Sequence, residues 1–316
     1  MHSPHPLPAH EPHLLFHAEA LATCRALEAG PLLDLVYLDP PFNVGAAFTA
    51  RTRMGEARGK RTSASGPVAY EDAWGGLDGF LAMLEATLRA IRERMSPRAT
   101  LWLHLDHRTV HYAKVRADAV FGSGAFRGEV IWLPGNGARG KKGPSITHQT
   151  LLVYTRDPRP SGDFVWNADD PLLREPYAET SQRMHFRHRD EDGRLYRERV
   201  INGKTYRYYA DEGRRLGSVW ADAPAMVANT PLREEATGYP TQKPEKLLER
   251  IVRASSHEGD VVADLMCGSG TTLVVAAKLG RRFVGGDASP LAIETTRRRL
   301  DRNGIAYRMQ DIAPAS

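Results

Sequence analysis

The sequence predicts an α/β fold built on a mostly parallel β-sheet with helices on both faces. Two short apolar runs that end in an aspartate and a loop, residues 34–39 and 260–264, are typical of buried strands. Strand and helix patterns alternate between and after them, which is the order of elements in parallel sheets. Ligand sites in such folds lie at the carboxyl ends of the strands, so the two aspartate loops are candidate sites.

The remaining elements follow from hydrophobic periodicity and from Gly and Pro punctuation. Helical periodicity predicts helices over residues 77–95, 107–121, 271–279 and 290–302. Apolar and β-branched runs predict strands over residues 100–105, 129–133, 150–155 and 282–286, with a last strand near Tyr307. Residues 1–12 are rich in His and Pro and have no apolar core, so they predict a disordered lead-in rather than a signal peptide.

Two segments interrupt this alternation. Residues 43–72 are rich in Gly, Ala, Ser and Arg and predict a long mobile loop. Residues 156–235 break the α/β pattern altogether and predict an inserted region. The rest of the domain is then expected in two halves, residues 13–155 and 236–311.

The composition is that of a globular protein with a mild positive charge. The chain has 316 residues, 41% hydrophobic and 26% charged, with a net charge of +5 and a pI near 9.2. This balance agrees with a polyanionic partner but does not require one. Cys24 and Cys267 are too few for a disulfide framework and lack metal-ligand spacing, and no apolar run is long enough for a membrane span. We therefore expect a soluble, cytoplasmic protein without a bound metal.

A glycine-rich loop follows Asp264, between a predicted strand and a predicted helix. Gly268 and Gly270 allow the backbone to turn tightly and to approach a ligand, and the helix start offers free N–H groups. The dinucleotide fingerprint is absent, because no glycine stands three residues after Gly270. Asp287 ends the next strand, where α/β folds bind a ribose. A cofactor with an amino-acid tail would suit this loop, with Asp264 near its ammonium group and the helix start near its carboxylate.

The stretch Asp39-Pro40-Pro41-Phe42 predicts a site that acts on an exocyclic base amine. The lone pair of such an amine is delocalised into the ring, so methylation needs acceptors for the amine hydrogens and for the growing positive charge. Asp39 offers a carboxylate and Pro40 a carbonyl, while the two proline rings fix the backbone. Phe42 can stack on a base extruded from the duplex. Alone, this stretch would also suit a rigid turn, and its pairing with the glycine-rich loop makes the prediction specific.

In this order the motifs resemble those of the β-class amino-methyltransferases of DNA, in which the catalytic motif precedes the cofactor motif. Residues 37–43 match the catalytic motif and residues 264–270 match the cofactor loop. Residues 238–244, followed by a helix over residues 245–255, match the motif that closes over the methionine end of the cofactor. Supporting matches lie at residues 101–106, 129–132, 148–154 and 218–220.

The resemblance implies a Rossmann-like, seven-stranded class I methyltransferase sheet with a circularly permuted motif order. It implies S-adenosylmethionine as cofactor, S-adenosylhomocysteine as product, double-stranded DNA as substrate and residues 156–235 as the target-recognition insertion. The implied catalytic residues are Asp39, Pro40, Pro41 and Phe42. The implied cofactor residues are Asp39, Thr241, Gln242, Lys243, Pro244, Asp264, Cys267, Gly268, Ser269, Gly270, Thr271 and Asp287. The thiol of Cys267 is expected to pack rather than to react, because nothing nearby in the sequence would lower its pKa.

Three cationic segments are predicted to contact DNA. Residues 183–218 hold ten Lys or Arg against six Asp or Glu, interleaved with tyrosines, a pattern that also suits a solvated hairpin. The others are a Gly-rich loop near residue 140 and the loop beside the catalytic motif. The DNA-binding candidates are Arg187, Arg189, Tyr206, Arg207, Arg139, Lys141, Lys142, Arg51, Arg53, Arg58, Lys60 and Arg61.

Asp rather than Ser at position 39 favours adenine N6 as the methylated amine, with cytosine N4 as the closest alternative. An enzyme acting on RNA or on a protein amide would more often carry Asn-Pro-Pro, and a nicotinamide oxidoreductase would need the missing glycine. An inactive DNA-binding relative would not need intact motifs in both halves. A homodimer, a cognate restriction endonuclease and association with the nucleoid are predicted by analogy with the family alone.

Overall fold

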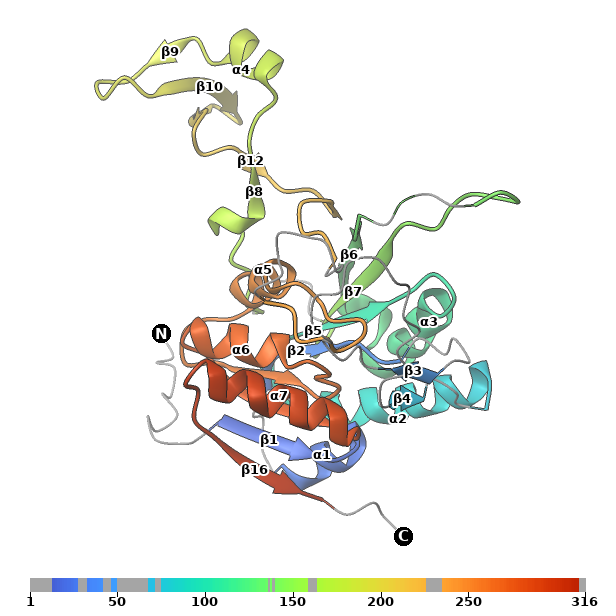
Figure 1. Ribbon diagram of the computed structural model, residues 1–316. Coiled ribbons are helices and arrows are strands. Elements are labelled where there is room, and N and C mark those ends of the chain that lie inside the picture. Colours follow the sequence, from blue (N-terminus) through green and yellow to red (C-terminus); the bar gives the residue numbers. More distant parts are fainter. Residues whose placement is uncertain are drawn as a thin grey trace, which may run out of the picture. The chain divides into compact units, whose positions relative to one another are not determined.

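The computed structural model describes residues 13–27, 33–41, 47–49, 68–71, 75–135, 137, 140–158, 164–225 and 235–312, with the backbone alone at 47–49 and 68–71. The chain divides into two compact units (Figure 1). The larger unit comprises residues 1–165 and 219–316, and the smaller unit is Trp166–Ser218. The smaller unit is shorter than the insertion of residues 156–235 expected from the sequence.

A nine-stranded sheet forms the centre of the larger unit. Its spatial order is β13-β6-β7-β5-β2-β14-β15-β1-β16, and the neighbouring strands are parallel except where β7 pairs with β6 and β5. The strands are β1 (His13–His17), β2 (Leu33–Leu38), β5 (Met95–Leu105), β6 (Phe126–Trp132), β7 (Gln149–Thr155), β13 (Val219–Trp220), β14 (Val261–Asp264), β15 (Arg282–Asp287) and β16 (Tyr307–Asp311). The predicted, mostly parallel sheet is confirmed. It has nine strands rather than seven, because the two-residue β13 and the C-terminal β16 extend its two edges.

Helices cover both faces of the sheet, as the alternation of elements predicts (Figure 1). Neighbouring helices contact each other within two groups. One group is α1 (Ala20–Ala26), α2 (Leu77–Arg94) and α3 (Val110–Phe121); the other is α5 (Glu245–Ser255), α6 (Thr271–Lys278) and α7 (Pro290–Arg302). A central strand between two such layers is buried on both sides, and Leu33, Val36 and Leu38 of β2 are accordingly inaccessible to solvent.

Two of the element boundaries that differ from the predicted ones have a local reason. Strand β5 begins at Met95 rather than near residue 100, because the register with β2 shifts between Leu33 and Leu35 and the bulge accommodates Pro97. Helix α3 begins at Val110 rather than at residue 107, because the Asp106 carboxylate accepts the backbone N–H of Arg108 at 2.9 Å in a turn before the helix.

Two short strands lie within the predicted loop of residues 43–72. Strands β3 (Ala47–Thr49) and β4 (Val68–Glu71) pair in antiparallel fashion. The rest of that loop lies outside the described residues, as do the predicted lead-in of residues 1–12 and Phe42. The same holds for the DNA-binding candidates Arg51, Arg53, Arg58, Lys60, Arg61 and Arg139.

The smaller unit combines one short helix with two small antiparallel sheets. Strands β9 (His188–Arg189), β10 (Leu195–Ile201) and β11 (Lys204–Tyr209) form one sheet, and β8 (Arg174–Glu175) pairs with β12 (Arg214–Arg215). Its other elements are α4 (Glu179–His185) and the 3₁₀ turn Pro171–Leu173; a similar turn in the larger unit is Ser123–Ala125. The ring centres of Tyr177 and Phe186 are 4.7 Å apart in its small core.

Candidate active site

The two predicted aspartate loops meet at one edge of the sheet. Strands β2, β14 and β15 are adjacent and parallel, so their carboxyl ends lie side by side. Asp39 follows β2, Asp264 ends β14 and Asp287 ends β15. All three line one cavity of about 490 Å³, a volume in the usual range for small-molecule sites. Other predicted site residues lining it are Pro40, Pro41, Thr241, Gln242, Lys243, Cys267, Gly268, Ser269 and Thr271.

The glycine-rich loop has a backbone conformation that requires glycine. Gly268 and Gly270 have φ angles of +50° and +71°, and the N–H of Gly270 donates to the carbonyl of Cys267 at 2.8 Å. A Cβ atom on Gly270 would lie 2.7 Å from Oγ1 of Thr296 on α7. Gly270 therefore shapes the loop without lining the cavity, while α6 begins at the next residue. The Cys267 thiol is buried, which raises its pKa well above its usual value and agrees with a packing role.

The Asp287 carboxylate is fixed by two backbone donors at the cavity wall. It accepts the N–H of Gly268 and the N–H of Ser289, both at 2.9 Å. Burial raises the pKa of Asp287 to about 6, although these hydrogen bonds oppose the rise. The carboxylate lies at the end of the second strand of a β14–α6–β15 unit, a position suited to bind a ribose.

Asp264 holds the loop together as well as lining the cavity. Its carboxylate accepts the Thr272 hydroxyl at 2.6 Å and the N–H of Met266 at 3.3 Å, and the side chain is 3% exposed. Burial raises the pKa of Asp264 to about 7, and the negative charges of Asp39 and Asp287 add to this rise. Asp264 is therefore closely tied to the loop backbone.

Asp39 has one oxygen engaged and one oxygen without a partner. The Lys243 ammonium group donates to Oδ2 of Asp39, and it also donates to the carbonyl of Thr241 at 3.3 Å. Oδ1 of Asp39 is buried and has no hydrogen-bond partner among the described residues. Burial raises the pKa of Asp39, while the positive charge of Lys243 lowers it. A buried acceptor without a donor is costly, so this oxygen is suited to receive an N–H from a bound molecule.

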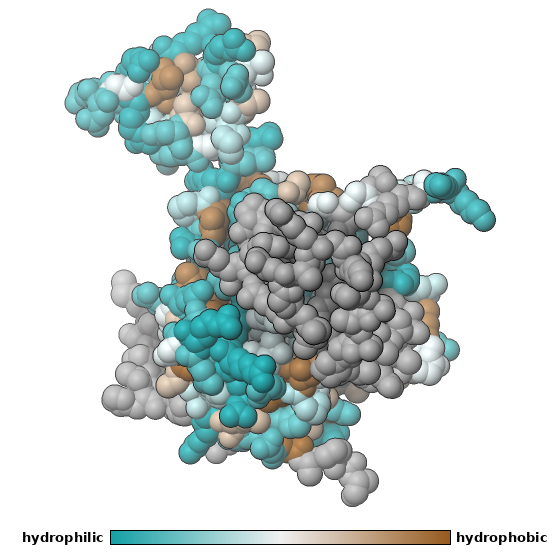
Figure 2. Space-filling view, in the orientation of Figure 1, coloured by the Kyte–Doolittle hydropathy of each residue, from teal (hydrophilic) through white to brown (hydrophobic). Residues whose placement is uncertain are grey.

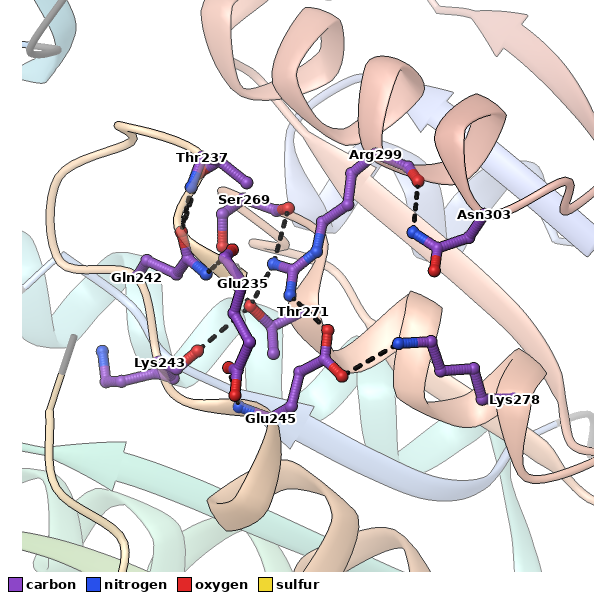
Figure 3. A network of polar contacts seen from close by, with 10 residues as sticks. All are labelled: Glu235, Thr237, Gln242, Lys243, Glu245, Ser269, Thr271, Lys278, Arg299 and Asn303. Carbon is purple, nitrogen blue, oxygen red and sulfur yellow. Dashed lines mark hydrogen bonds and ion pairs between the residues drawn. The ribbon is translucent and has the colours of Figure 1, made fainter. Parts of the chain in front are cut away.

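Hydrogen bonds of Gln242 fix the conformation of the segment that carries Lys243 (Figure 3). The side-chain oxygen of Gln242 accepts the N–H and the hydroxyl of Thr237 at 2.9 and 2.8 Å, and its amide donates to the carbonyl of Glu235 at 2.8 Å. Thr241 has a φ angle of +58°, which is uncommon for a β-branched residue. Pro244 does not line the cavity; it is the N-terminal cap residue of α5.

Arg299 on α7 joins this segment to the glycine-rich loop, and sequence reasoning did not identify it (Figure 3). Its guanidinium donates to the Thr271 hydroxyl at 2.7 Å and to the Glu245 carboxylate at 2.8 Å, and the side chain is 5% exposed. The Thr271 hydroxyl in turn donates to the carbonyl of Lys243 at 3.1 Å. Lys278 donates to the other oxygen of Glu245 at 3.0 Å. Helical spacing was the available signal, because position 299 lies on the same face of α7 as the buried Thr296.

A second feature that sequence reasoning missed is a buried hydrogen-bond chain beside the cavity. The Tyr37 hydroxyl donates to Nδ1 of His104 at 2.7 Å, and Nε2 of His104 donates to the side-chain oxygen of Gln149 at 2.7 Å. Burial and the charge of Lys243 hold the pKa of His104 well below its usual range, so the ring is neutral. Both imidazole nitrogens are engaged in hydrogen bonds, so neither is available to act as a catalytic base.

The described DNA-binding candidates do not line the cavity. Lys141 and Lys142 are exposed in a loop of the larger unit. Arg187, Arg189, Tyr206 and Arg207 are exposed in the smaller unit, on β9, β11 and the residues just before β9. The described residues contain no cluster of His, Cys, Asp and Glu that could hold a metal ion. Among the helices in the described parts of the chain, none is long and apolar enough to cross a membrane.

Comparison with known proteins identifies relatives of this chain in sequence and in fold. "DNA adenine methyltransferase YhdJ" of Escherichia coli (strain K12) is 26% identical over 289 residues, 91% of this chain and 82% of the relative. The fold is similar to that of the M1.HpyAVI–SAM complex (TM-score 0.54, 17% identity, 91% of this chain and 98% of that one). It is also similar to that of the cytosine-N4-specific PvuII DNA methyltransferase (TM-score 0.55, 12% identity, 91% and 86%). The model of the N6- and N4-methyltransferase family, described as DNA methylase, matches residues 33–298, so the chain belongs to this family of S-adenosylmethionine-dependent DNA methyltransferases.

Proposed function

We propose that this DNA methyltransferase transfers the methyl group to the N6 amine of adenine in double-stranded DNA. The observation that carries the proposal is the buried Oδ1 of Asp39, which has no donor among the described residues and belongs to the cavity that also holds the glycine-rich loop. An adenine amine has two hydrogens to donate. Asp39 would accept one of them and the carbonyl of Pro40 the other, which favours the pyramidal nitrogen needed for attack.

S-Adenosylmethionine, when bound, supplies an electrophilic methyl group on a sulfonium centre. Asp287 would accept the ribose hydroxyls, and Gly268 leaves room for the backbone to approach the cofactor. Thr241, Gln242 and Lys243 would line the part of the cavity that holds the methionine end of the cofactor. Cavity volume and donor set both fit such a molecule, which carries an ammonium group, a carboxylate and a ribose.

The roles of the remaining predicted residues are part of the same proposal. Phe42 would stack on the extruded base, and the nitrogen would release its proton to solvent after transfer. Residues 13–155 would form the catalytic half of the domain and residues 236–311 the cofactor half. The insertion of residues 156–235 would recognise the target sequence, and the exposed cations of the predicted segments would contact phosphates.

Cytosine N4 is the second candidate, because its amine presents the same two hydrogens and because a cytosine-N4-specific enzyme shares the fold. Asp at position 39 and the similarity to an adenine methyltransferase over 91% of the chain support adenine. Mass spectrometry of nucleosides from DNA methylated by the purified protein distinguishes the two bases. N6-methyladenine is expected, and N4-methylcytosine would replace the adenine assignment.

The catalytic assignment is tested with Asp39→Ala, compared with wild type by single-molecule sequencing of DNA from an expressing host. Asp301→Asn, on the exposed end of α7, removes an equal charge and serves as the control. Asp39→Ala is expected to abolish methylation and Asp301→Asn to preserve it. Full methylation by Asp39→Ala would contradict the role given to Asp39. A homodimer, a cognate endonuclease and nucleoid association stay predictions. Size-exclusion chromatography would test the homodimer, and cell fractionation would test the association with the nucleoid.

A further inference from the structure

The distal part of the β10–β11 hairpin projects from the smaller unit as an uncovered two-stranded ribbon. Strand β9 pairs with only the first two residues of β10, Leu195 and Tyr196. Residues 198–207 are all exposed. The face of this unit that Figure 2 shows is largely hydrophilic. Nevertheless Val200, Ile201 and Tyr206 are 71%, 45% and 40% exposed, so burial in the fold does not explain these apolar side chains.

The ribbon is closed by a turn that suits a regular hairpin. Asn202 and Gly203 have φ angles of +50° and +75°, and Ile201 pairs with Lys204 across them. Asn-Gly with both residues in the left-handed region is typical of a type I′ turn, whose twist matches that of the flanking strands. The turn therefore fixes the register and the facing of every side chain on the ribbon.

This register distributes the charged side chains, which are mixed along the sequence, between two opposite faces of the ribbon. Directly opposite residues share a face. One face carries Tyr196, Glu198, Val200, Thr205, Arg207 and Tyr209. On it Arg207, one of the predicted DNA contacts, is neutralised, because its guanidinium pairs with Glu198 at 3.1 Å and lies 4.1 Å from the centre of the Tyr196 ring. This pairing disfavours a phosphate contact by Arg207.

The other face carries Arg197, Arg199, Ile201, Lys204, Tyr206 and Tyr208, and no carboxylate. Arg197 packs against the core of the smaller unit, since its guanidinium lies 5.1 Å from the centre of the Phe186 ring and 5.2 Å from the centre of the Tyr177 ring. Lys204 lies 5.5 Å above Tyr206. Arg199 stands opposite Tyr206 and forms no ion pair with any of the residues that the structure describes. We call Arg199, Ile201, Lys204 and Tyr206 the cationic face.

We propose that the cationic face enters the major groove of duplex DNA and that Arg199 reads a base edge there. The proposal rests on the proposed function. The major groove is wide enough for a two-stranded ribbon, and two cations without a carboxylate complement its phosphate walls. Arg199 has the planar donor fork that matches the O6 and N7 atoms of guanine. Ile201 and Tyr206 would contact thymine methyl groups or sugars, which accounts for their exposure.

The test compares two variants that change the net charge equally on opposite faces of the same ribbon. Arg199→Gln removes a positive charge from the cationic face, and Thr205→Glu adds a negative charge to the other face. Binding to a fluorescent 30-base-pair duplex, carrying the site that sequencing finds for the wild type, is measured by anisotropy from low to high NaCl. Arg199→Gln should weaken binding about tenfold or more, while Thr205→Glu should change it less than about threefold.

Arg199→Lys separates base reading from charge. It should keep the salt dependence of the wild type and lose much of the preference for the methylated site over a scrambled duplex, because lysine lacks the donor fork. Equal weakening by Arg199→Gln and Thr205→Glu, or wild-type binding and site choice by both Arg199 variants, would overturn the proposal. If DNA is bound through Arg199 but the methyl group is found on cytosine N4, the proposed function fails and the ribbon assignment holds. If methylation depends on Asp39 but not on Arg199, the ribbon assignment fails and the proposed function holds.

Discussion

The ammonium group of Lys243 lies against the carboxylate of Asp39, although the two residues are 204 positions apart in the chain. Lys243 is 9% exposed and Asp39 18% exposed at the side chain, so the pair is shielded from solvent. The other oxygen of Asp39 has no donor among the residues described. Lys243 thus opposes the rise that burial causes in the pKa of Asp39, and it leaves one oxygen available to a substrate amine.

Removing this ammonium group should change how methylation depends on pH. Burial raises the pKa of Asp39 and Lys243 lowers it, so Lys243→Met leaves the rise unopposed. Asp39 would then become protonated at a higher pH, and the ionised carboxylate that accepts the amine hydrogen would be lost. The acidic limb of the rate profile should therefore move upward by about one to three pH units. Rates of wild type, Lys243→Met and the charge-preserving Lys243→Arg, measured from pH 5.5 to 9.5, provide the check. A uniform loss at every pH would argue against this role.

Arg299 should stabilise the cofactor side of the pocket far more than its neighbour Arg298. Arg299→Met leaves the half-buried Glu245 without its guanidinium partner, and breaking such a buried pair costs about 3 kcal/mol. The side chain of Arg298 is 74% exposed in its pair with Glu294, so Arg298→Met should cost about 0.5 kcal/mol or less. Urea unfolding measures both free energies.

Cofactor affinity gives a second measurement on the same two variants. Arg299 orients Thr271, whose hydroxyl holds the carbonyl of Lys243. Arg299→Met should therefore raise the KM for S-adenosylmethionine about tenfold with a smaller effect on kcat, since the acceptor groups at Asp39 remain in place. Equal effects of the Arg298 and Arg299 variants would contradict the network shown in Figure 3.

Gly270 should tolerate no side chain. Gly270→Ala combines a φ angle of +71° with a Cβ atom 2.7 Å from Oγ1 of Thr296. The left-handed conformation alone costs about 1–2 kcal/mol, and the contact would displace α7 from the loop. We expect a lower melting temperature and loss of cofactor binding by calorimetry. Gly217→Ala is the control, because a Cβ there meets no atom within 4 Å.

The strands that carry the site were predictable because each has a local signature. Apolar runs ending in Asp39 and Asp264 predict β2 and β14. The stretch Gly268-Ser269-Gly270 predicts the loop between β14 and α6. Parallel neighbours must end at the same edge, so the meeting of the two loops follows from the fold class.

The polar network was not predictable because its partners are distant in the chain. Arg299 stands in a run of three arginines, and helical spacing can place it on the buried face of α7 but cannot identify the groups that it contacts. Its partner Glu245 lies 54 positions away on another helix. The charges of the ribbon are a similar case, since Glu198 and Arg207 can be paired only once the register of β10 and β11 is known.

The stability of the free protein should fall as the pH rises from about 4 to 7. Burial raises the pKa of Asp264 to about 7 in the folded state, against an ordinary value of 3.8. The folded protein then binds a proton that the unfolded chain has released, so stability is fully present below pH 4 and declines as the pH passes through 7. Asp287, with a pKa of about 6, acts in the same direction. Asp264→Asn cannot ionise, so its melting temperature, measured by circular dichroism from pH 4.5 to 8, should fall less than that of the wild type. Parallel curves for the two proteins would mean that Asp264 is already ionised at acidic pH.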